Sequence, residues 1–430
     1  MYLHERPAIR RAWDSFRASE SEDASTGQCL VTGEVGPIAR LHGSVGGFGQ
    51  DKPTMVGFNQ PSFESYRKSQ GQNAPVSESA AFKYATALNY LIKDRNHHIN
   101  LHGDKILFWA ERNAPVEEAL AACFFSPDFV PEDMGLDENA SSMIRGILSA
   151  LFTGKLPEGT EVDQSVRFYV LGVSANKTRL VVRFFHTDTF GGIAARVARH
   201  YQDISVVGID RIVSPYRILL ETAVGRESDN VAPNLEGALM QSILNGAVYP
   251  SGLYQAILRR IRAEGGKDPK KAKGHAINPI RVGLLKGYLN RMDRLNQKKE
   301  RMTVALNKEE KDIGYLLGRL FALLEKAQKD ALGDVNASIV DKYLNSALAT
   351  PQMVFPMLLT LSKKHIKKAD NRYMDRLIGE VVDLIPSTGF PISLNAEEQG
   401  RFIIGYYHQN KALYTKRENG DQPDNIETEE

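Results

Sequence analysis

Residues 168–201, FYVLGVSANKTRLVVRFFHTDTFGGIAARVARHY, decide the fold class of this chain. Residues 168–174 and 179–185 are apolar runs rich in β-branched and aromatic side chains, and the polar link 175–178 separates them. This pattern predicts a β-hairpin. Thr189 and the glycines after it then begin an amphipathic helix. The apolar face of that helix consists of Ile193, Val197 and Tyr201.

The predicted turn of the hairpin carries Asn176, Lys177 and Arg179 close together. A basic tip with an amide, held on a rigid ribbon, suits contact with a phosphate backbone or a base edge. The alternative is an ordinary turn whose charges are only solvated. The pattern of this stretch does not decide between the two.

Length and composition limit the classes of protein that fit. The 430 residues suffice for two or three domains, and 25% charged residues with a net charge of +2 indicate a soluble globular protein. Only Cys29 and Cys123 occur, which excludes a disulfide framework and a thiolate zinc site and favours a reducing cytoplasm. No apolar run approaches the roughly 20 residues of a membrane span, and the first residues contain no hydrophobic signal core.

The order of predicted elements indicates an α+β fold, in which a mixed sheet-and-helix front domain precedes an all-helical carboxy-terminal bundle. Besides the hairpin, the predicted strands are 29–32, 55–58, 106–110 and 204–209. The predicted helices are 78–91, 115–125, 141–152, 216–223, 235–245, 251–264, 280–296, 338–349, 354–366, 374–384 and 396–413. We divide the chain into an α+β domain (1–213, with its core around 166–209), a basic helical region (214–301), the bundle (302–414) and a disordered acidic tail (415–430).

A polar run at 59–73 follows a glycine-rich stretch at 41–54. The glycine-rich stretch lacks the Gly-Lys-Ser/Thr of a nucleotide loop, so we expect a surface loop. In the polar run, the amides of Asn59 and Asn73 are candidates for base edges, and Tyr66 is a candidate for stacking on an unpaired base. A polar loop that satisfies its own backbone is the alternative. Ser77 is predicted to cap the helix that follows.

The segment 259–301 has the largest excess of positive charge, with 14 basic residues against 4 acidic ones. Such a density is typical of a surface that contacts phosphate. The basic residues that we select from it as candidate nucleic-acid contacts are Arg259, Arg260, Lys270, Lys271 and Lys273. A solvated helix face is the alternative.

A second basic feature lies in the predicted bundle. Lys363, Lys364, Lys367 and Lys368 are spaced so that they share one side of a helix. Such a stripe suits a displaced DNA strand. A solvated helix end is the alternative.

No catalytic constellation is evident in the sequence, so we expect no enzymatic activity, no cofactor and no metal. His186 and Asp188 could form a base and its orienting carboxylate, but no nucleophile can be placed beside them. His97, His98 and His102 straddle a predicted turn and strand, so convergence on a metal is not expected. His408 is explained by a packed helix face.

Four stretches together resemble the large, signature subunit of the type I-C CRISPR effector complex, a Cascade-type assembly. They are the hairpin stretch above, CLVTGEVGPIARLH at 29–42, FNQPSFESYRKSQGQNAPVSESAAFKYATALNYLI at 58–92, and FIIGYYHQN at 402–410. The resemblance covers almost the whole chain in the family's order. The family normally has a further amino-terminal region, implicated in reading the protospacer-adjacent motif, so this chain is expected to be a fragment or to have been assigned a late start.

The resemblance implies a cytoplasmic, non-catalytic, DNA- and RNA-binding subunit in antiviral defence. It would help to recognise target DNA and its adjacent motif, stabilise the R-loop and recruit the helicase–nuclease. The implied partners are guide CRISPR RNA, target double-stranded DNA, the helicase–nuclease and the backbone, guide-end-binding and small subunits. Alternatives are a ribonuclease that processes guide RNA and a helical scaffold without nucleic-acid contact. The bundle resembles the small subunit that the family makes from an internal start, for which Met302 is the candidate.

Overall fold

The computed structural model describes residues 6–19, 25–126, 146–147, 162–266, 274–333 and 338–415. Its contacts divide the chain into two compact units. Unit 1 comprises Met1–Leu148 and Pro157–Ala194, and unit 2 comprises Ser149–Leu156 and Ala195–Glu430. Sheets in the front half and helices in the back half confirm the α+β class. The predicted domain boundaries at residues 213 and 301 both fall inside unit 2 and stay predictions. Of the predicted helix 141–152 the structure describes only residues 146–147, and the tail after residue 415 lies outside the described residues.

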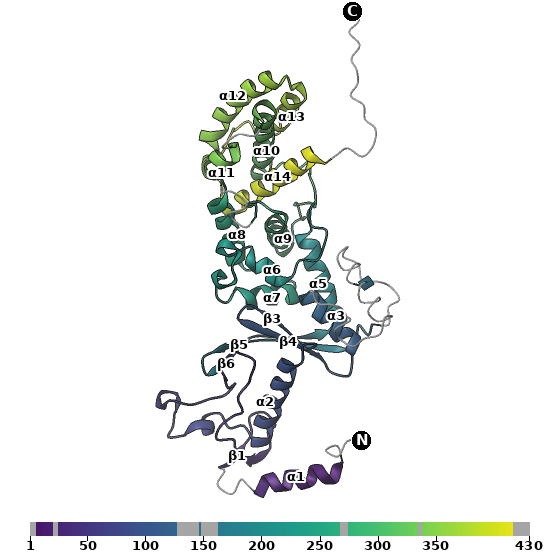
Figure 1. Cartoon of the computed structure of the whole chain (residues 1–430), viewed down its shortest axis with the longest axis vertical. Helices are drawn as coiled ribbons and strands as arrows, with labels where there is room; N and C mark the ends of the chain where they lie inside the picture. Colours follow the sequence, from purple (N-terminus) through teal and green to yellow (C-terminus); the bar gives the residue numbers. More distant parts are fainter. Residues whose placement is uncertain are drawn as a thin grey trace, which may run out of the picture. The chain divides into compact units, whose positions relative to one another are not determined.

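Unit 1 contains one antiparallel four-stranded sheet with the strand order β3-β4-β5-β6 (Figure 1). Its strands are β3 (His98–Leu101), β4 (Asp104–Ala110), β5 (Arg167–Asn176) and β6 (Arg179–Thr189). A separate two-stranded sheet pairs β1 (Thr26–Gln28) with β2 (Val35–Pro37). The helices are α1 (Pro7–Ser19), α2 (Glu78–Lys93), α3 (Pro115–Phe125) and the start of α5 (Phe190–Ile204), with short 3-10 turns η2 (Pro61–Phe63) and η3 (Gln70–Asn73).

The predicted hairpin is confirmed, with a tighter turn than expected. Asn176 pairs with Arg179, so only Lys177 and Thr178 form the loop, and Lys177 has a φ of 54°. Two-residue hairpin loops favour positive φ because the resulting twist matches that of the strands. The register of the β5–β6 pairing shifts between Gly172 and Val173. A Cβ added to Gly172 would lie 2.4 Å from the Phe184 ring, so only glycine at this position lets the ring of β6 pack on β5.

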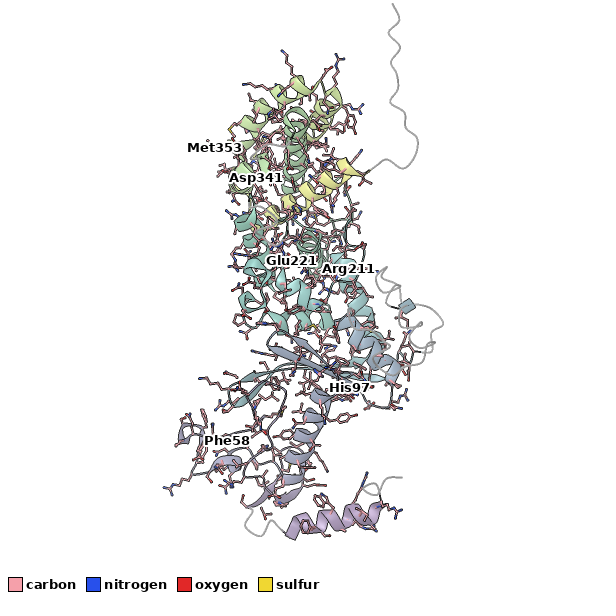
Figure 2. The ribbon with its side chains drawn as sticks, in the orientation of Figure 1. Phe58, His97, Arg211, Glu221, Asp341 and Met353 are labelled. Carbon is pink, nitrogen blue, oxygen red and sulfur yellow. The ribbon has the colours of Figure 1, made fainter. Side chains whose placement is uncertain are left out.

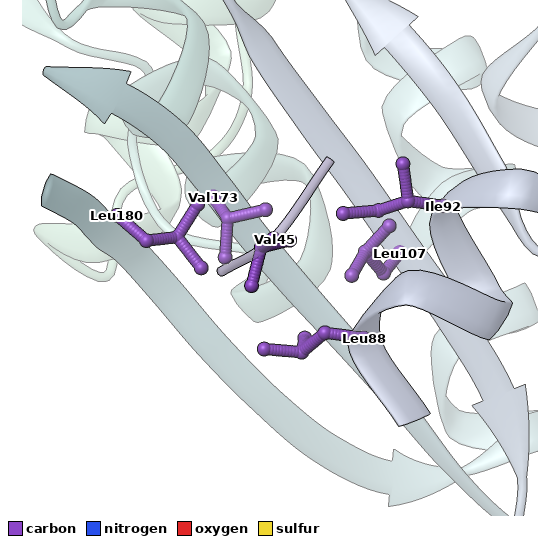
Figure 3. Packing of buried hydrophobic residues seen from close by; sticks show 6 residues of the cluster. All are labelled: Val45, Leu88, Ile92, Leu107, Val173 and Leu180. Carbon is purple, nitrogen blue, oxygen red and sulfur yellow. The ribbon is translucent and has the colours of Figure 1, made fainter. Parts of the chain in front are cut away.

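One hydrophobic core cluster of unit 1 lies between α2 and the sheet (Figure 3). Its buried members are Val45, Leu88, Ile92, Leu107, Val173 and Leu180. Ser77 caps α2 as predicted, since its hydroxyl accepts from the N–H of Ala80 at 3.3 Å. Most residues of the glycine-rich stretch 41–54 are exposed in a loop, as predicted, and the fully buried Val45 joins this loop to the core cluster.

Three predicted strands are wrong. Residues 29–32 form a turn between β1 and β2, closed by the N–H of Gly33 donating to the Cys29 carbonyl. Residues 55–58 do not pair with any described strand, and the preceding Thr54 forms only isolated β-bridges, with Ser44 and Arg179. In the run 204–209, α5 continues to Ile204, and Val206 is buried in the helical unit. Apolar runs of this length mark burial, which helices and irregular segments provide as well as strands.

Unit 2 is helical in its described parts. The end of α5 is followed by α6 (Pro215–Leu220), α7 (Leu235–Asn245), α8 (Ser251–Glu264) and α9 (Pro279–Leu295), with the short turns η5 (Val224–Arg226) and η6 (Ser228–Asn230). The bundle adds α10 (Ile313–Leu332), α11 (Ile339–Ala349), α12 (Pro351–Ala369), α13 (Arg372–Val382) and α14 (Ala396–Tyr414). Asn395 caps α14, because its side-chain oxygen accepts from the N–H of Glu398.

The centre of the bundle is the close contact of α10 with α14, the first and the last of its helices (Figure 1). A Cβ built on Gly318 would lie 1.9 Å from the carbonyl oxygen of Phe402, and one on Gly405 would lie 2.2 Å from that of Tyr315. Glycine is therefore required on both helices for the backbones to approach this closely. Phe321 and Phe402 pack beside this contact with ring centroids 5.5 Å apart.

Candidate nucleic-acid interface

The tip of the β5–β6 hairpin is fixed by a segment from earlier in the chain. The N–H of Thr54 donates to the carbonyl oxygen of Thr178 at 2.9 Å, and the N–H of Leu180 donates to that of Thr54 at 3.0 Å. Thr54 therefore lies beside Arg179 as a short parallel bridge. Asn176, Lys177 and Arg179 are all exposed at this tip.

Arg179 joins the hairpin tip to the polar run that the sequence presented as a separate candidate. Its guanidinium carbon lies 3.9 Å from the centroid of the Phe63 ring in η2. A cation–π contact of this kind contributes about 0.5–1 kcal/mol at an exposed site. Phe63 belongs to unit 1, as does Phe58 five residues earlier, which is labelled in Figure 2. Two of the predicted candidate stretches are thus neighbours in space.

Exposed cations gather around this contact, and we call them the tip surface. They are Arg40, Lys52, Arg67, Lys68, Lys177 and Arg179. Arg40 donates from Nη1 to Oε1 of Gln70 at 2.9 Å. Among the described residues, none of these cations forms an ion pair with a carboxylate. Their charge is therefore directed to solvent, as a surface that attracts phosphate requires.

The loop at 61–73 is held in a strained conformation by its own hydrogen bonds. Asn73 accepts from the N–H of Ser65 at 2.9 Å and donates to the carbonyl oxygens of Lys68 and Gln70 at 2.9 and 3.0 Å. Tyr66, Arg67 and Gln70 have φ values of 52°, 57° and 46°. The left-handed region costs L-residues roughly 1–2 kcal/mol each, and such strain is typical of functional loops.

The three residues of the polar run 59–73 that we predicted to contact nucleic acid differ in their surroundings. The Asn73 amide is engaged with the loop backbone, as the alternative interpretation expected. Tyr66 is 94% exposed, and Asn59 is exposed beside a cavity. Contact of any of these residues with nucleic acid stays a prediction.

That cavity has a volume of about 320 Å³ and lies inside the tip surface. Its polar lining includes Arg40, His42, Lys52, Asn59, Gln70 and Arg179, besides Thr54 and Thr178. His42 is only 8% exposed, and its Nδ1 forms a short hydrogen bond with the hydroxyl of Tyr84. Burial lowers the pKa of His42 and raises the pKa of Tyr84 to about 12, so both groups are neutral near pH 7. No described group accepts from or donates to Nε2 of His42.

The basic segment 259–301 requires a correction, because several of its cations are internal. Arg281 is fully buried, and it contacts Oε2 of Glu221 at 3.0 Å and Oε2 of Glu264 at 2.6 Å (Glu221 is labelled in Figure 2). Arg301 pairs with Asp293 and Asp312, both at 3.5 Å. A count of charges along the sequence cannot show which of them face carboxylates brought in by other helices.

A second internal cluster of this segment surrounds Asp203, at the end of α5. This carboxylate is 2% exposed and contacts Arg291 at 2.6 Å, Arg294 at 2.7 Å and Arg199 at 3.3 Å. Lys286 is also buried, and its ammonium donates to the carbonyl oxygens of Gln202 and Asp203 at 3.1 and 2.9 Å. These cations position α5 against α9 and are not a phosphate-binding surface.

The buried lysine predicts a pH dependence of stability. Burial lowers the pKa of Lys286 from 10.5 to about 8, although Asp203 and Glu300 oppose this shift. Between about pH 8 and 10 the native state therefore binds fewer protons than the unfolded state, and its stability rises with pH by at most about 1.4 kcal/mol per unit. Urea unfolding of the wild type and of Lys286→Met at pH 7.5, 8.5 and 9.5 measures this rise. We expect the variant to lose it; an identical pH profile would contradict the assignment.

The remaining predicted contacts of unit 2 are only partly described. Arg259 is exposed and Arg260 half-buried on α8, whereas Lys270, Lys271 and Lys273 lie outside the described residues. The four lysines of the stripe, Lys363, Lys364, Lys367 and Lys368, are all exposed on α12. Their binding to nucleic acid stays a prediction.

Met302, the predicted internal start, is 4% exposed in the segment between α9 and α10. Its N–H donates to Oδ1 of Asn290 at 3.0 Å, and its carbonyl oxygen accepts from Nδ2 of the same residue at 2.7 Å. A product that begins at Met302 would lose this partner, since Asn290 precedes it. Translation from Met302 stays a prediction.

Sequence reasoning missed Arg40, His42, Lys52 and Arg67 as members of the site. Arg40 and His42 lie in the quoted motif 29–42, and Arg67 lies in the polar run 59–73 beside Tyr66, so membership of these stretches was the available signal. Lys52 lies in the glycine-rich stretch 41–54, which we expected to be a surface loop. These four residues come together through two contacts between distant segments. Thr54 pairs with the hairpin, and the Gly71 N–H donates to the carbonyl oxygen of Arg40 at 3.1 Å. Neither contact leaves a local pattern.

His408, which the sequence assigned to a packed helix face, is buried in the bundle. His408 is 1% exposed, its Nδ1 lies 3.0 Å from the Tyr315 hydroxyl, and burial lowers its pKa to about 4. In the described ranges, His, Cys, Asp and Glu side chains form no group of three or more that could hold a metal. None of the helices in those ranges has both the length and the apolar character that crossing a membrane requires.

Comparison with known proteins supplies one match. The model of a family described as CRISPR-associated protein (Cas_Csd1) matches residues 1–414. The match covers the tip surface, the basic segment and the whole bundle. The search of curated proteins finds no match.

Proposed function

Because the chain belongs to the CRISPR-associated Cas_Csd1 family, and is thus a subunit of a CRISPR effector assembly, we propose that it binds nucleic acid there without catalysing a reaction. The observation that carries this proposal is the tip surface, where cations from four segments gather without carboxylate partners among the described residues. Such a surface holds a phosphate backbone, whereas base pairing to a guide supplies the sequence discrimination.

The finer role that we propose is that of a type I-C large subunit in antiviral defence. In this role the tip surface contacts target DNA near its adjacent motif, and the exposed lysines of α12 contact the displaced strand. Guide RNA, the other effector subunits and the helicase–nuclease are the corresponding partners. The internal ion pairs of α9 favour a structural role for that part of the basic segment.

Neutralising the tip surface should weaken DNA binding. We expect the triple variant Arg67→Gln, Lys68→Gln, Lys177→Gln to bind a labelled duplex more weakly, because these exposed side chains are free of carboxylate partners among the described residues. The slope of log K against log salt should fall by about 0.9 for each lost phosphate contact, which fluorescence anisotropy between 50 and 200 mM salt measures.

A matched variant controls for the change in overall charge. Lys83→Gln, Lys93→Gln, Arg95→Gln removes the same charge from exposed positions on α2 and the turn after it, also in unit 1. We expect this variant to retain most of the affinity and the slope. An unchanged slope in the tip variant, or equal losses in both variants, would contradict the proposed surface.

A further inference from the structure

His42, one of the residues that line the cavity in the tip surface, has a buried polar atom without a partner in the described chain. His42 is 8% exposed, and its Nε2 has no described hydrogen-bond partner. A buried polar group left unsatisfied costs about 1–3 kcal/mol, and such groups in native proteins call for an explanation. A ligand that hydrogen-bonds to Nε2 from the cavity would remove this cost.

We propose that this cavity binds the base of one unpaired nucleotide of a nucleic-acid strand, whose phosphate is held by the cations at the rim. The inference rests on the proposed function, because it requires a strand at the tip surface. It specifies where on the tip surface a base binds, that the ligand is a single nucleotide of the strand, and that His42 orients its base.

The partner of His42 determines which atom of the base it can meet. Either partner can donate in the hydrogen bond between Nδ1 of His42 and the Tyr84 hydroxyl, and we infer that the hydroxyl donates, because its proton then has an acceptor. In this arrangement the proton of the imidazole is on Nε2. The Nε2–H group is then a donor, and the carbonyl oxygens of unpaired bases are acceptors. Because Tyr84 belongs to α2 and His42 is buried against it, the orientation of the donor is fixed before binding.

The rest of the lining matches the two ends of a nucleotide. Leu41, Val56 and Phe58 provide apolar wall, and the amides of Asn59 and Gln70 can hydrogen-bond to a base edge. Lys52 and Arg179 are exposed cations in the same lining, where a phosphate can remain in contact with water. The volume of about 320 Å³ is at the lower end of small-molecule sites, which span roughly 300–1,000 Å³.

The test uses the full chain and duplex DNA with one extrahelical nucleotide. Each of the four bases is placed in turn at the bulge, and the reference is the same duplex with an abasic residue there. We expect at least one base to bind about tenfold more tightly than the abasic duplex, since base contacts of this kind are worth about 1–3 kcal/mol. Fluorescence anisotropy measures both affinities.

Three variants separate the cavity from the surrounding charge. His42→Phe keeps an aromatic ring beside Tyr84 but removes the Nε2 donor, so it should reduce the preference for a base about fivefold. Asn59→Ala, at an exposed position where misfolding is not expected, should also reduce it. Lys177→Ala lies outside the lining, so it should weaken both duplexes equally and leave their ratio unchanged.

The outcomes distinguish failure of the cavity from failure of the proposed function. Equal, salt-dependent binding of bulged and abasic duplexes by the wild type would overturn the cavity assignment and leave the phosphate-binding surface intact. Binding of neither duplex would overturn the proposed function and the inference with it. Displacement of the bulged duplex by micromolar deoxynucleoside monophosphates would show a site for free nucleotides and would overturn the assignment to a strand.

Discussion

Replacing Asp203 by asparagine should destabilise unit 2 by about 3–5 kcal/mol, the range measured when one partner of a buried ion pair is removed. The carboxylate contacts Arg291 and Arg294 of α9 as well as Arg199 of its own helix. Arg291 is 2% exposed, so its charge cannot turn to water when the carboxylate is lost. Urea unfolding followed by far-UV circular dichroism measures the loss.

Two further variants identify the cause of this loss. The double variant Asp203→Asn, Arg291→Met should recover part of the stability, because it removes the most deeply buried of the unpaired charges. Glu380→Gln removes the same kind of charge from a pair with Arg376 in which both side chains are more than half exposed, and should change stability by less than about 1 kcal/mol. Equal effects of Asp203→Asn and Glu380→Gln would contradict the role of burial.

The second large effect is expected at the contact between α10 and α14. The Cβ of Gly318→Ala would lie 1.9 Å from the carbonyl oxygen of Phe402 and 2.7 Å from the backbone nitrogen of Tyr406. These are backbone atoms of a helix, so the two helices must separate and lose the packing of Phe321 on Phe402. We expect a loss of about 3 kcal/mol, at the upper end of the effects of overpacking.

Gly379→Ala is the matched control, since Gly379 is also a helical glycine but its added Cβ has no heavy atom within 4 Å apart from its chain neighbours and the backbone of its own helix. Alanine is the better helix former there and should stabilise by about 0.5–1 kcal/mol. Circular dichroism measures both changes, and fluorescence of Trp13 and Trp109, the two tryptophans of the chain and both in unit 1, shows whether a change extends to that unit. A Gly318→Ala variant as stable as Gly379→Ala would contradict the close approach.

The elements that the sequence predicted well are those whose signals are local. Two apolar, β-branched and aromatic runs joined by a short polar link located the β5–β6 hairpin. The predicted helices 115–125, 235–245 and 251–264 have the same bounds as α3, α7 and α8. The run 55–58 has the composition of a strand, but a strand also needs a neighbour with free backbone groups. In this chain the neighbouring Thr54 makes the only bridge of that segment to the hairpin.

The candidate site could be predicted only in pieces. Lys177 and Arg179 follow from the turn of the hairpin, but Arg40 and Lys52 join them through contacts between segments far apart in the sequence. The same reason explains the error over the basic segment, since Arg291 meets a carboxylate 88 positions earlier. The density of charged residues along a sequence shows which side chains are present, but it does not show whether they are exposed at the surface or paired in the interior.

The pairing of α10 with α14 also bears on how the chain is made. Ribosomes release a polypeptide from its amino terminus onward, and α14 is the last helix before the end of the described residues. The apolar side of α10 therefore emerges long before the helix that covers it. Until synthesis is nearly complete, that side is open to chaperones and to aggregation, because a non-local contact cannot form before both of its partners exist.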